Sequence, residues 1–422
     1  MKYIVYLCRI LVGGLFIVSG LIKANDTVGF GYKLEEYFSP EVLNMPFLIP
    51  IATGLAAFIC IAEIVLGVAT LLGGKMKITA WSLLLLTVFF TFLTFYSAYF
   101  NKVTDCGCFG DALKLTPWQS FTKDVVLLVF VLVIFLYRKR IQMNTWTEDR
   151  LMCLSALACV VGFADGMIGW FFPVTFTIIV LGGSLAIKYF VLKNKPSEWI
   201  IAGFTTILSL AFCLYTYAYL PIKDFRAYRI GTNILKAMEI PDNAPRDVFE
   251  TKLYYEKGGV VKEFTTKDYP WNDSTWVWKE TKNVLISKGY RAPIHDFSIN
   301  DSNGTNHVQE FMTAQGYSLV IVSYNLPKYN TAVQAKINTL TDELAKANVH
   351  CYGIVGSSVE DAAKFKKAQH IPYDLYTCDA TALKTIIRSN PGLVLIKDGV
   401  VTNMWHYNSI PTVADLKKTY GL

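Results

Sequence analysis

The first half of the chain alternates long apolar runs with short polar loops, and the second half has the mixed pattern of an ordinary soluble sequence. A helix of about 20 apolar residues can cross a bilayer, because its backbone polar groups are satisfied within the segment. Asp165 and Gly166 interrupt one of the apolar runs. The pattern predicts about seven spans, at residues 3–22, 47–72, 78–100, 121–137, 151–171, 174–192 and 199–220.

From residue 289 onward, short apolar runs with strand character alternate with helical patterns, which is typical of an α/β sheet. A Lys397-Asp398-Gly399 turn joins the last two runs and indicates a closing antiparallel pair. We expect strands at 317–323, 350–355, 373–377, 392–397 and 400–406, and helices at 331–347, 359–368, 380–387 and 412–420.

The region between these two halves shows strand signals at 249–256 and 260–266 around a Lys-Gly-Gly turn, followed by a tryptophan-rich run. The sequence thus predicts a polytopic α-helical membrane bundle followed by a soluble α/β domain. The expected parts are a transmembrane bundle at 1–140, additional transmembrane helices at 141–222, a juxtamembrane and β-rich connector at 223–288, and the α/β domain at 289–422.

Composition and charge support a membrane protein with a defined orientation. A mean hydropathy of +0.35 is too high for a purely soluble chain. The basic residues gather in alternate loops, which predicts a cytoplasmic N-terminus and a C-terminal domain outside the cytoplasm. The net charge of +7 follows mostly from this asymmetry, so lipid is an expected partner and nucleic acid is not. Arg9 within the first span, with no small-residue cleavage site, indicates a retained helix.

Two of the nine cysteines stand out, because Cys106 and Cys108 lie in a polar loop within the stretch Cys-Gly-Cys-Phe-Gly. Two thiols one residue apart can form a disulfide or bind a soft metal. A metal site would need two further ligands that the sequence does not supply, so no metal is assigned. Cys351 and Cys378 fall in predicted core strands and are expected to be structural, and the remaining cysteines lie within apolar spans and are expected to be buried.

Two charged residues inside the spans need partners, since an unpaired charge in hydrocarbon is costly. Arg9 and Glu63 lie at similar depths when each is counted from the cytoplasmic end of its own helix, at 1.5 Å per residue. We therefore expect an intramembrane Arg9–Glu63 ion pair. The pair either stabilises the bundle or serves a proton or quinone reaction, and the sequence leaves both readings open.

Residues 3–137 resemble the DoxX/MauE group of membrane proteins. The matching residues are Arg9, Gly14, Ser19-Gly20 and Lys23 in the first span, Ala62-Glu63 and Gly67 in the second, and Asp105 to Gly110 in the cysteine loop. The last stretch is similar to MauE, the methylamine-utilisation membrane protein. This resemblance implies a role in disulfide formation in a periplasmic protein, with Cys106 and Cys108 as the catalytic residues.

Residues 289–422 resemble a thioredoxin-fold domain of the peroxiredoxin/TlpA type. The stretch from Gly289 to Ile299 is similar to the first strand of that family, and Asn390-Pro391-Gly392 is similar to its cis-proline segment, which makes Pro391 the expected cis-proline. The family places its catalytic cysteines after the strand at 317–323, where this chain has Ser323-Tyr324-Asn325. The sequence contains no Cys-x-x-Cys, so ordinary thioredoxin chemistry is not expected in this domain.

Three functions remain open from the sequence. In the first, Cys106 and Cys108 exchange thiols and disulfides as an oxidoreductase, with a periplasmic protein as substrate and a quinone as a candidate electron acceptor. No flavin, haem or quinone signature identifies the cofactor. In the second, the protein is a non-catalytic scaffold whose thioredoxin-like domain holds an envelope partner. In the third, the two thiols capture copper or zinc.

Overall fold

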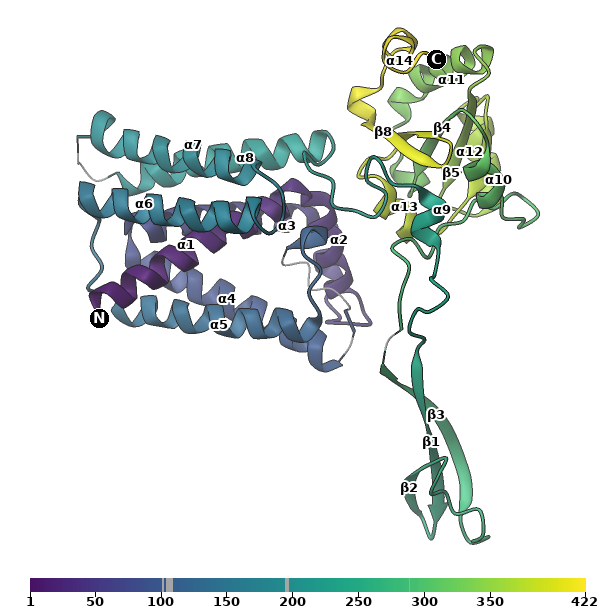
Figure 1. Ribbon diagram of the computed structural model, residues 1–422, viewed down its shortest axis with the longest axis horizontal. Coiled ribbons are helices and arrows are strands. Elements are labelled where there is room, and N and C mark those ends of the chain that lie inside the picture. Colours follow the sequence, from purple (N-terminus) through teal and green to yellow (C-terminus); the bar gives the residue numbers. More distant parts are fainter. Residues whose placement is uncertain (101, 104–108, 194–196, 288) are drawn as a thin grey trace.

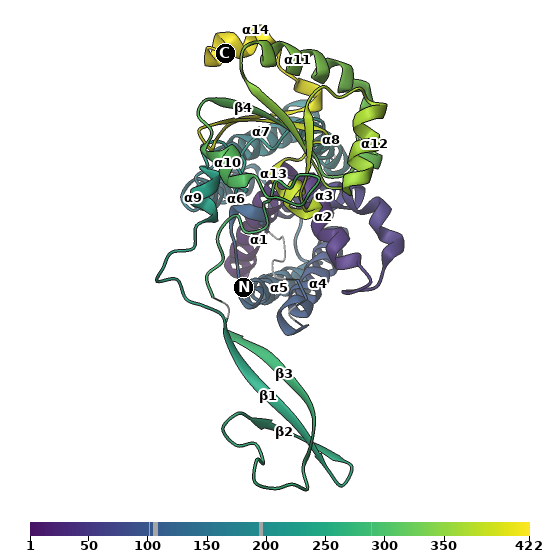
Figure 2. The ribbon, with the colours of Figure 1, turned by 90° about the vertical axis from the view of Figure 1, so that its right-hand side faces the viewer.

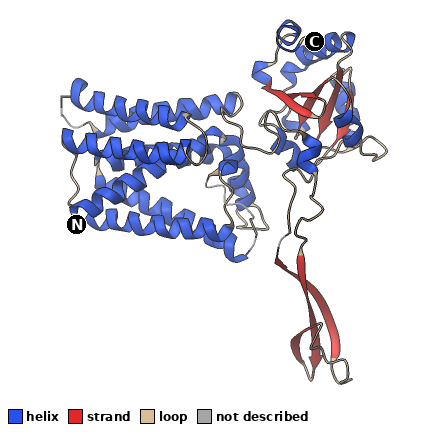
Figure 3. Cartoon of the chain, viewed as in Figure 1, coloured by secondary structure: helices blue, strands red, loops and turns tan. Residues whose placement is uncertain are grey.

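The computed structural model describes residues 1–100, 102–103, 109–193, 197–287 and 289–422. A helical bundle, an α/β domain at one end of it and a separate three-stranded sheet make up the molecule (Figure 1). Strands occur in the last two parts and helices dominate the first (Figure 3). The N-terminus lies at the end of the bundle opposite the α/β domain (Figure 1).

Six helices within the described part of the chain are long and apolar enough to cross a membrane, by length and composition. Their outer surfaces expose large apolar side chains, which implies contact with lipid. The predicted membrane bundle is therefore confirmed, with six such helices among the described residues where the sequence predicted about seven spans. The six are α1 (Lys2–Asn25), α3 (Ala52–Leu72), α4 (Met76–Phe100), α5 (Pro117–Tyr137), α7 (Phe172–Ala186, extended by a π-helical turn at Ile187–Val191) and α8 (Glu198–Ala218).

The predicted span at 151–171 corresponds to α6 (Trp146–Val160) and a π-helical turn at Val161–Asp165. This segment runs along the bundle beside α1 and α7 (Figure 1). It is less apolar than its neighbours because it carries Asp149, which is fully buried and accepts a hydrogen bond from Lys188 at 2.5 Å. Pairing with Lys188 allows this acidic helix to pack inside the bundle.

Helix α1 packs closely against α3 because small residues face the contact. A Cβ atom added at Gly13 would lie 2.6 Å from the Leu71 side chain, closer than real Cβ atoms come. Two helices that meet at glycines can approach closely, and dispersion contacts then stabilise the pair within lipid. A short helix, α2 (Thr27–Phe38), follows α1 and lies at the end of the bundle that faces the α/β domain (Figure 1).

The α/β domain contains a five-stranded sheet in the order β6-β5-β4-β7-β8. Strands β4, β5 and β6 are parallel, and β7 and β8 are antiparallel to their neighbours, so the predicted closing hairpin is confirmed. This is the sheet of a thioredoxin-like domain. The strands are β4 (Tyr317–Ser323), β5 (His350–Val355), β6 (Asp374–Thr377), β7 (Gly392–Lys397) and β8 (Val400–His406), and the helices are α10 (Val308–Thr313), α11 (Gln334–Lys346), α12 (Val359–Ala368), α13 (Ala380–Ile386) and α14 (Val413–Tyr420), with α9 (Ile234–Met238) before the domain.

The separate sheet, here called the paddle, consists of β1 (Val248–Lys257), β2 (Val260–Thr265) and β3 (Val277–Ser287) in the order β2-β1-β3. It projects away from the bundle and the α/β domain in both views (Figure 2). None of its strand residues is buried. Asp247 closes its base by accepting hydrogen bonds from the Gly289 amide at 2.8 Å and from Arg291 at 2.6 Å.

Candidate functional site

Cys106 and Cys108 lie outside the described residues, but the residues on either side of them are described. Val103 and Phe109 are both buried. Helix α4 ends and α5 begins at the end of the bundle nearest the α/β domain (Figure 1). Thr116 and Gln119 start α5 with a capping box, in which each side chain accepts a hydrogen bond from the other residue's amide.

Phe109, the residue after Cys108, is anchored between α5 and the π-helical turn after α6. Its ring centroid is 5.2 Å from that of Phe163, and the Lys123 Nζ lies 5.0 Å from the centre of the Phe109 ring. An ammonium over an aromatic face is attracted by the ring quadrupole. The residue next to the cysteine pair is therefore packed into the bundle against a lysine.

Phe109 also lines a small polar cavity within the bundle, together with Glu63, Thr87 and Asp124. The cavity has about 20 Å³, which is room for about one water molecule. The second Glu63 carboxylate oxygen and the Thr87 hydroxyl are buried with no hydrogen-bond partner among the described residues. Polar groups in contact with such a cavity can be satisfied by water.

Two ion pairs surround this cavity. The Lys23 Nζ is 2.5 Å from the Glu63 Oε1, and the Lys123 Nζ is 2.5 Å from the Asp124 Oδ1. Asp124 also accepts a hydrogen bond from the Thr94 hydroxyl at 3.0 Å. Pairing offsets part of the cost of removing each charge from water. The bundle thus holds a charged cluster beside Phe109.

The expected Arg9–Glu63 pair is wrong, because Glu63 pairs with Lys23. Arg9 instead donates hydrogen bonds to the carbonyl oxygens of Thr70 at 2.9 Å and Leu71 at 3.0 Å, and to the Asn144 amide oxygen at 2.8 Å. The depth argument assumed that the two helices end at the same level. Arg9 is in fact level with the last turn of α3, whose free carbonyls need donors, and the long Lys23 side chain reaches Glu63.

The thioredoxin-like domain contacts the bundle through a second charged pair. Arg388 follows α13, and its Nε lies 3.0 Å from both carboxylate oxygens of Asp26, while its Nη2 is 2.9 Å from Oδ2. Asp26 connects α1 to α2 and caps α2 by accepting from the Gly29 amide at 2.9 Å. A multidentate contact of this kind fixes orientation as well as distance. The domain is therefore held against the start of α2.

The electrostatics of this contact keep both groups charged at neutral pH. Burial by itself would raise the pKa of Asp26, but Arg388 outweighs burial and the pKa is lowered from its usual value. Burial likewise opposes the charge on Arg388, and Asp26 with a smaller contribution from Asp111 raises its pKa. Asp111 lies three residues after Cys108 in the sequence. Asp111 thus contributes to the electrostatics of the interface.

The edge of the domain where thioredoxins carry their thiols is closed by hydrogen bonds. The buried Ser323 hydroxyl and the Asn390 amide oxygen are 2.7 Å apart, and Asn390 donates to the Asn325 carbonyl at 2.6 Å. The Asn390–Pro391 peptide bond is cis, which is the geometry expected for Pro391. Tyr324 contacts Tyr32 of α2 edge to face, with ring centroids 6.1 Å apart. This edge therefore faces α2.

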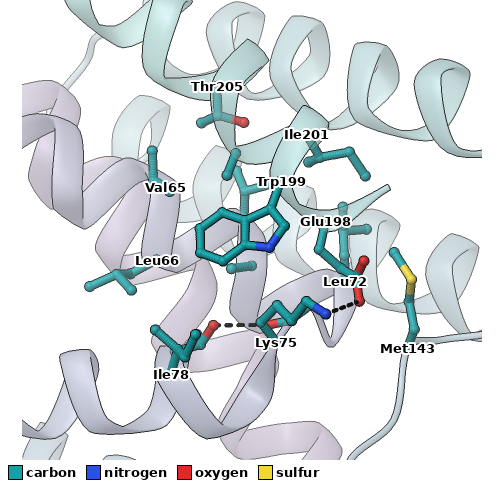
Figure 4. A pocket seen from close by; sticks show the side chains of 15 residues that line it. Val65, Leu66, Leu72, Lys75, Ile78, Met143, Glu198, Trp199, Ile201 and Thr205 are labelled. Carbon is teal, nitrogen blue, oxygen red and sulfur yellow. Dashed lines mark hydrogen bonds and ion pairs between the residues drawn. The ribbon is translucent and has the colours of Figure 1, made fainter. Parts of the chain in front are cut away.

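A pocket of about 120 Å³ lies at the other end of the bundle, between α3, α4 and α8. Figure 4 shows the Trp199 indole within it and Lys75 beside Glu198, whose charged atoms are 3.8 Å apart. This pocket is far along the bundle from the end where the cysteine-bearing segment lies. Among the described residues no group of three or more histidine, cysteine or acidic side chains could hold a metal ion.

Comparison with known proteins agrees with this arrangement. Residues 1–137 match the family model of methylamine utilisation protein MauE, and residues 249–288, which form most of the paddle, match a domain of unknown function (DUF8463). Protein TlpB of Flavobacterium psychrophilum is 28% identical over 139 residues, which is 32% of this chain and 37% of that protein. No solved structure matches the chain. The protein combines a MauE-like membrane region with a thioredoxin-like domain.

Sequence reasoning missed the Lys123–Asp124 and Asp26–Arg388 pairs. Lys123 and Asp124 stand three residues inside the apolar run at 121–137, and that position is the available signal. Asp26 and Arg388 are separated by 362 residues and had no such signal, because each lies in a polar segment of its own. Their pairing depends on how the domain meets the bundle.

Proposed function

We propose that this membrane protein takes part in thiol–disulfide exchange at the envelope face of a bacterial inner membrane, with Cys106 and Cys108 as the reactive pair. The N-terminus is then cytoplasmic, and the thioredoxin-like domain lies in a compartment where disulfides persist. The MauE family match covers both cysteines. The substrate is a periplasmic protein.

The observation that carries the proposal is the contact between Arg388 and Asp26. Through this contact a thioredoxin-like domain without thiols at its usual edge is held at the same end of the bundle as the segment that follows Cys108. Asp111, in that segment, acts electrostatically on Arg388. The domain is therefore suited to bring a substrate protein to a thiol pair that the bundle supplies.

A lysine in contact with Phe109 supports the proposal of thiol chemistry. The thiolate is the nucleophile, and a nearby lysine stabilises it. Lys123 contacts the ring of Phe109, the residue after Cys108. A disulfide between cysteines one residue apart closes a small ring, and strained disulfides are the more oxidising ones. The pair is thus suited to oxidise a substrate dithiol.

The test is to trap the thiols in cells with an alkylating reagent and compare the wild type with Cys106→Ser and Cys108→Ser. We expect the wild-type pair to occur in both redox states, and one single variant to accumulate a mixed disulfide with another protein. Cys351→Ser is the matched control and should trap nothing, because Cys351 is half-buried in β5. A pair that stays oxidised under reducing growth and never captures a partner would contradict the proposal.

The orientation is tested separately with Thr275→Cys in the paddle and Lys139→Cys between α5 and α6. In intact cells whose outer membrane has been permeabilised, we expect a membrane-impermeant maleimide to label position 275 and not position 139. The reverse labelling would place the thioredoxin-like domain in the cytoplasm and would remove the compartment that the proposal requires.

A second candidate function, a non-catalytic scaffold, is favoured by the closed edge of the thioredoxin-like domain. Ser323 and Asn390 are hydrogen-bonded there, and Tyr324 packs against α2, so the bundle itself occupies part of the edge. A scaffold needs the domain and its partner but no thiol cycle. In that case the Cys106→Ser/Cys108→Ser variant keeps its partner in co-purification and has no redox phenotype.

A further inference from the structure

We propose that the groove between α1, α5 and α6 binds a membrane quinone, which accepts the electrons of the Cys106/Cys108 pair. The inference rests on the proposed function and names its electron acceptor. The groove has a volume of about 390 Å³, within the range of pockets that hold small organic ligands. Its lining is mostly apolar and includes Leu11, Val18, Val126, Leu127, Phe130 and Val160.

The groove is open to the lipid-facing surface of the bundle. Val126 is half exposed, and Cys159, which the sequence placed among the buried cysteines, is exposed and lines the groove. Gly14 lines the groove on the α1 side with no side chain of its own. A hydrophobic molecule that diffuses in the bilayer can therefore enter from the side.

Two polar residues line one end of the groove, and they distinguish a quinone from a plain acyl chain as its occupant. Lys123 and Thr122 line it near the start of α5. A quinone carbonyl is a hydrogen-bond acceptor that the Lys123 ammonium can donate to, whereas an acyl chain offers no acceptor. Phe163 also lines the groove, and a quinone ring can stack against its aromatic side chain.

The residues at the same end of the groove are in contact with Phe109. Phe163 and Lys123 line the groove, and both also contact Phe109, at 5.2 Å between ring centroids and 5.0 Å from Nζ to the ring. Phe109 follows Cys108 in the chain. The pocket at the other end of the bundle, around Trp199, has no residue in common with this contact. A ligand in the α1–α5–α6 groove therefore lies next to two side chains that contact Phe109.

The redox step balances with a quinone as the oxidant. The two thiols lose two electrons and two protons, two S–H bonds break and one S–S bond forms. The quinone gains the two electrons and two protons, which form two O–H bonds, and leaves as a quinol. The disulfide then oxidises a substrate dithiol by exchange, which returns Cys106 and Cys108 to their thiol forms.

Quinone binding is tested in the Cys106→Ser/Cys108→Ser variant, so that no redox reaction accompanies it. The full chain in lipid nanodiscs is titrated with decylubiquinone. Val126→Trp fills the groove, and Val129→Trp is the matched control, since Val129 is exposed on the same helix and does not line the groove. We expect saturable binding of one quinone, weakened about tenfold or more by Val126→Trp and unchanged by Val129→Trp.

The inference would be overturned if decylubiquinone bound with equal affinity to the Cys106→Ser/Cys108→Ser protein and to its Val126→Trp and Val129→Trp derivatives, or if binding did not saturate. Either result would indicate that lipid occupies the groove. Lys123→Gln serves as a second variant and should weaken quinone binding without affecting incorporation of decane, which carries no acceptor. The failures are distinguishable. Thiols that cycle in cells without saturable quinone binding refute the acceptor alone, whereas saturable binding with thiols that never cycle refutes the proposed thiol exchange and leaves the quinone site standing.

Discussion

The membrane bundle and the thioredoxin-like domain divide between them what a single thioredoxin domain usually combines. The domain has the five-stranded sheet and a cis bond at Pro391, but Ser323 and Tyr324 stand where the family carries cysteines. The bundle has no such sheet, yet its sequence carries Cys106 and Cys108 and its interior holds paired charges. The comparison teaches that a thioredoxin-like fold and a pair of closely spaced cysteines can lie in different parts of one chain, with a specific contact between the two parts.

The two regions also treat charge differently. In the bundle, Lys23, Glu63 and Lys188 are buried and paired, because lipid offers no water to solvate them. In the thioredoxin-like domain most ion pairs are exposed, as between Lys364 and Glu360, and contribute little. Charges in the bundle should therefore be costly to unpair, and charges on the domain should matter mainly where they meet the bundle.

The largest effect is expected from Lys23→Met, which leaves the Glu63 carboxylate buried without its cation. Removing one partner of a buried pair costs about 3–5 kcal/mol, measured as the free energy of unfolding of the bundle in mixed micelles. The double variant Lys23→Met/Glu63→Leu should recover most of the loss. Lys33→Met is the control, since Lys33 pairs with Glu36 at the surface of α2 and its loss should change little. Equal losses in both single variants would show that burial of the pair is not what matters.

The second-largest effect is expected at the Arg388–Asp26 contact between the domain and the bundle. Arg388→Ala leaves Asp26 without its guanidinium partner, and breaking such a hydrogen-bonded pair costs about 2–5 kcal/mol of contact energy. We expect the domain to detach from α2, seen as faster hydrogen exchange in residues 27–38 and loss of a cross-link between the two parts. Lys384→Ala is the matched control, because Lys384 lies 3.8 Å from Glu35 and is partly exposed. Unchanged exchange in Arg388→Ala would mean that other contacts hold the domain.

A smaller, pH-dependent effect is expected on the stability of the thioredoxin-like domain, and it distinguishes the domain from its contact with α2. Burial lowers the pKa of His406 in β8 from 6.5 to about 4, so the folded domain favours the neutral ring. The unfolded chain binds the proton first, and this contribution to stability is complete above about pH 6.5 and is lost as the pH falls toward 4. His406→Gln should flatten the pH dependence of the domain's unfolding in this window. If the pH dependence of the domain's unfolding free energy is the same in His406→Gln as in the wild type, His406 is not its source.

The Asp26–Arg388 contact responds in a different window. Because the pKa of Asp26 is lowered in the folded protein, its contribution is present above the ordinary carboxyl pKa of about 4 and is lost only as the pH falls further. Between pH 7 and pH 5 the domain should therefore lose stability and stay attached. Detachment that begins near pH 6, followed by hydrogen exchange in α2, would contradict this assignment.

The smallest effect is expected from removing the paddle. Its strands bury no residue, and Asp247 closes its base against Gly289 and Arg291. Joining residues 247 and 289 through a short glycine-serine linker should leave the unfolding transitions of the bundle and the domain unchanged, as measured by differential scanning calorimetry. A lowered transition in either part would show that the paddle contributes to that part's stability.

Much of the fold could be predicted because its periodicities are long and regular. The ranges predicted for β4, β5, β7 and β8 equal those observed, since buried strands are continuous apolar runs bounded by turn residues. The membrane spans were predicted to within a few residues for the same reason. The span at 151–171 was harder, because α6 places charged residues among apolar ones and depends on Lys188 to bury Asp149.

The sequence identified candidate residues for the site but did not predict how the buried charges pair. The sequence singled out Cys106 and Cys108 as closely spaced thiols in a polar loop, and Glu63 and Arg9 as charged residues within apolar spans. The predicted partner of Glu63 was wrong, because the sequence of a single helix does not determine its position along the neighbouring helix. The close packing of Gly13 against Leu71 helps to set the position of α1 along α3. That position brings Lys23 to the same depth as Glu63.

By itself the sequence determined which parts of the chain enter the membrane, that the α/β domain closes with an antiparallel hairpin, and that its edge lacks a Cys-x-x-Cys. These properties are local, since hydropathy, periodicity and residue identity are carried by each segment. The tertiary structure alone decided that Lys23 pairs with Glu63, that Arg388 meets Asp26, and that a groove runs from the lipid surface to Lys123. Those properties depend on the positions of segments that are distant in the chain, and packing between helices and domains determines such positions.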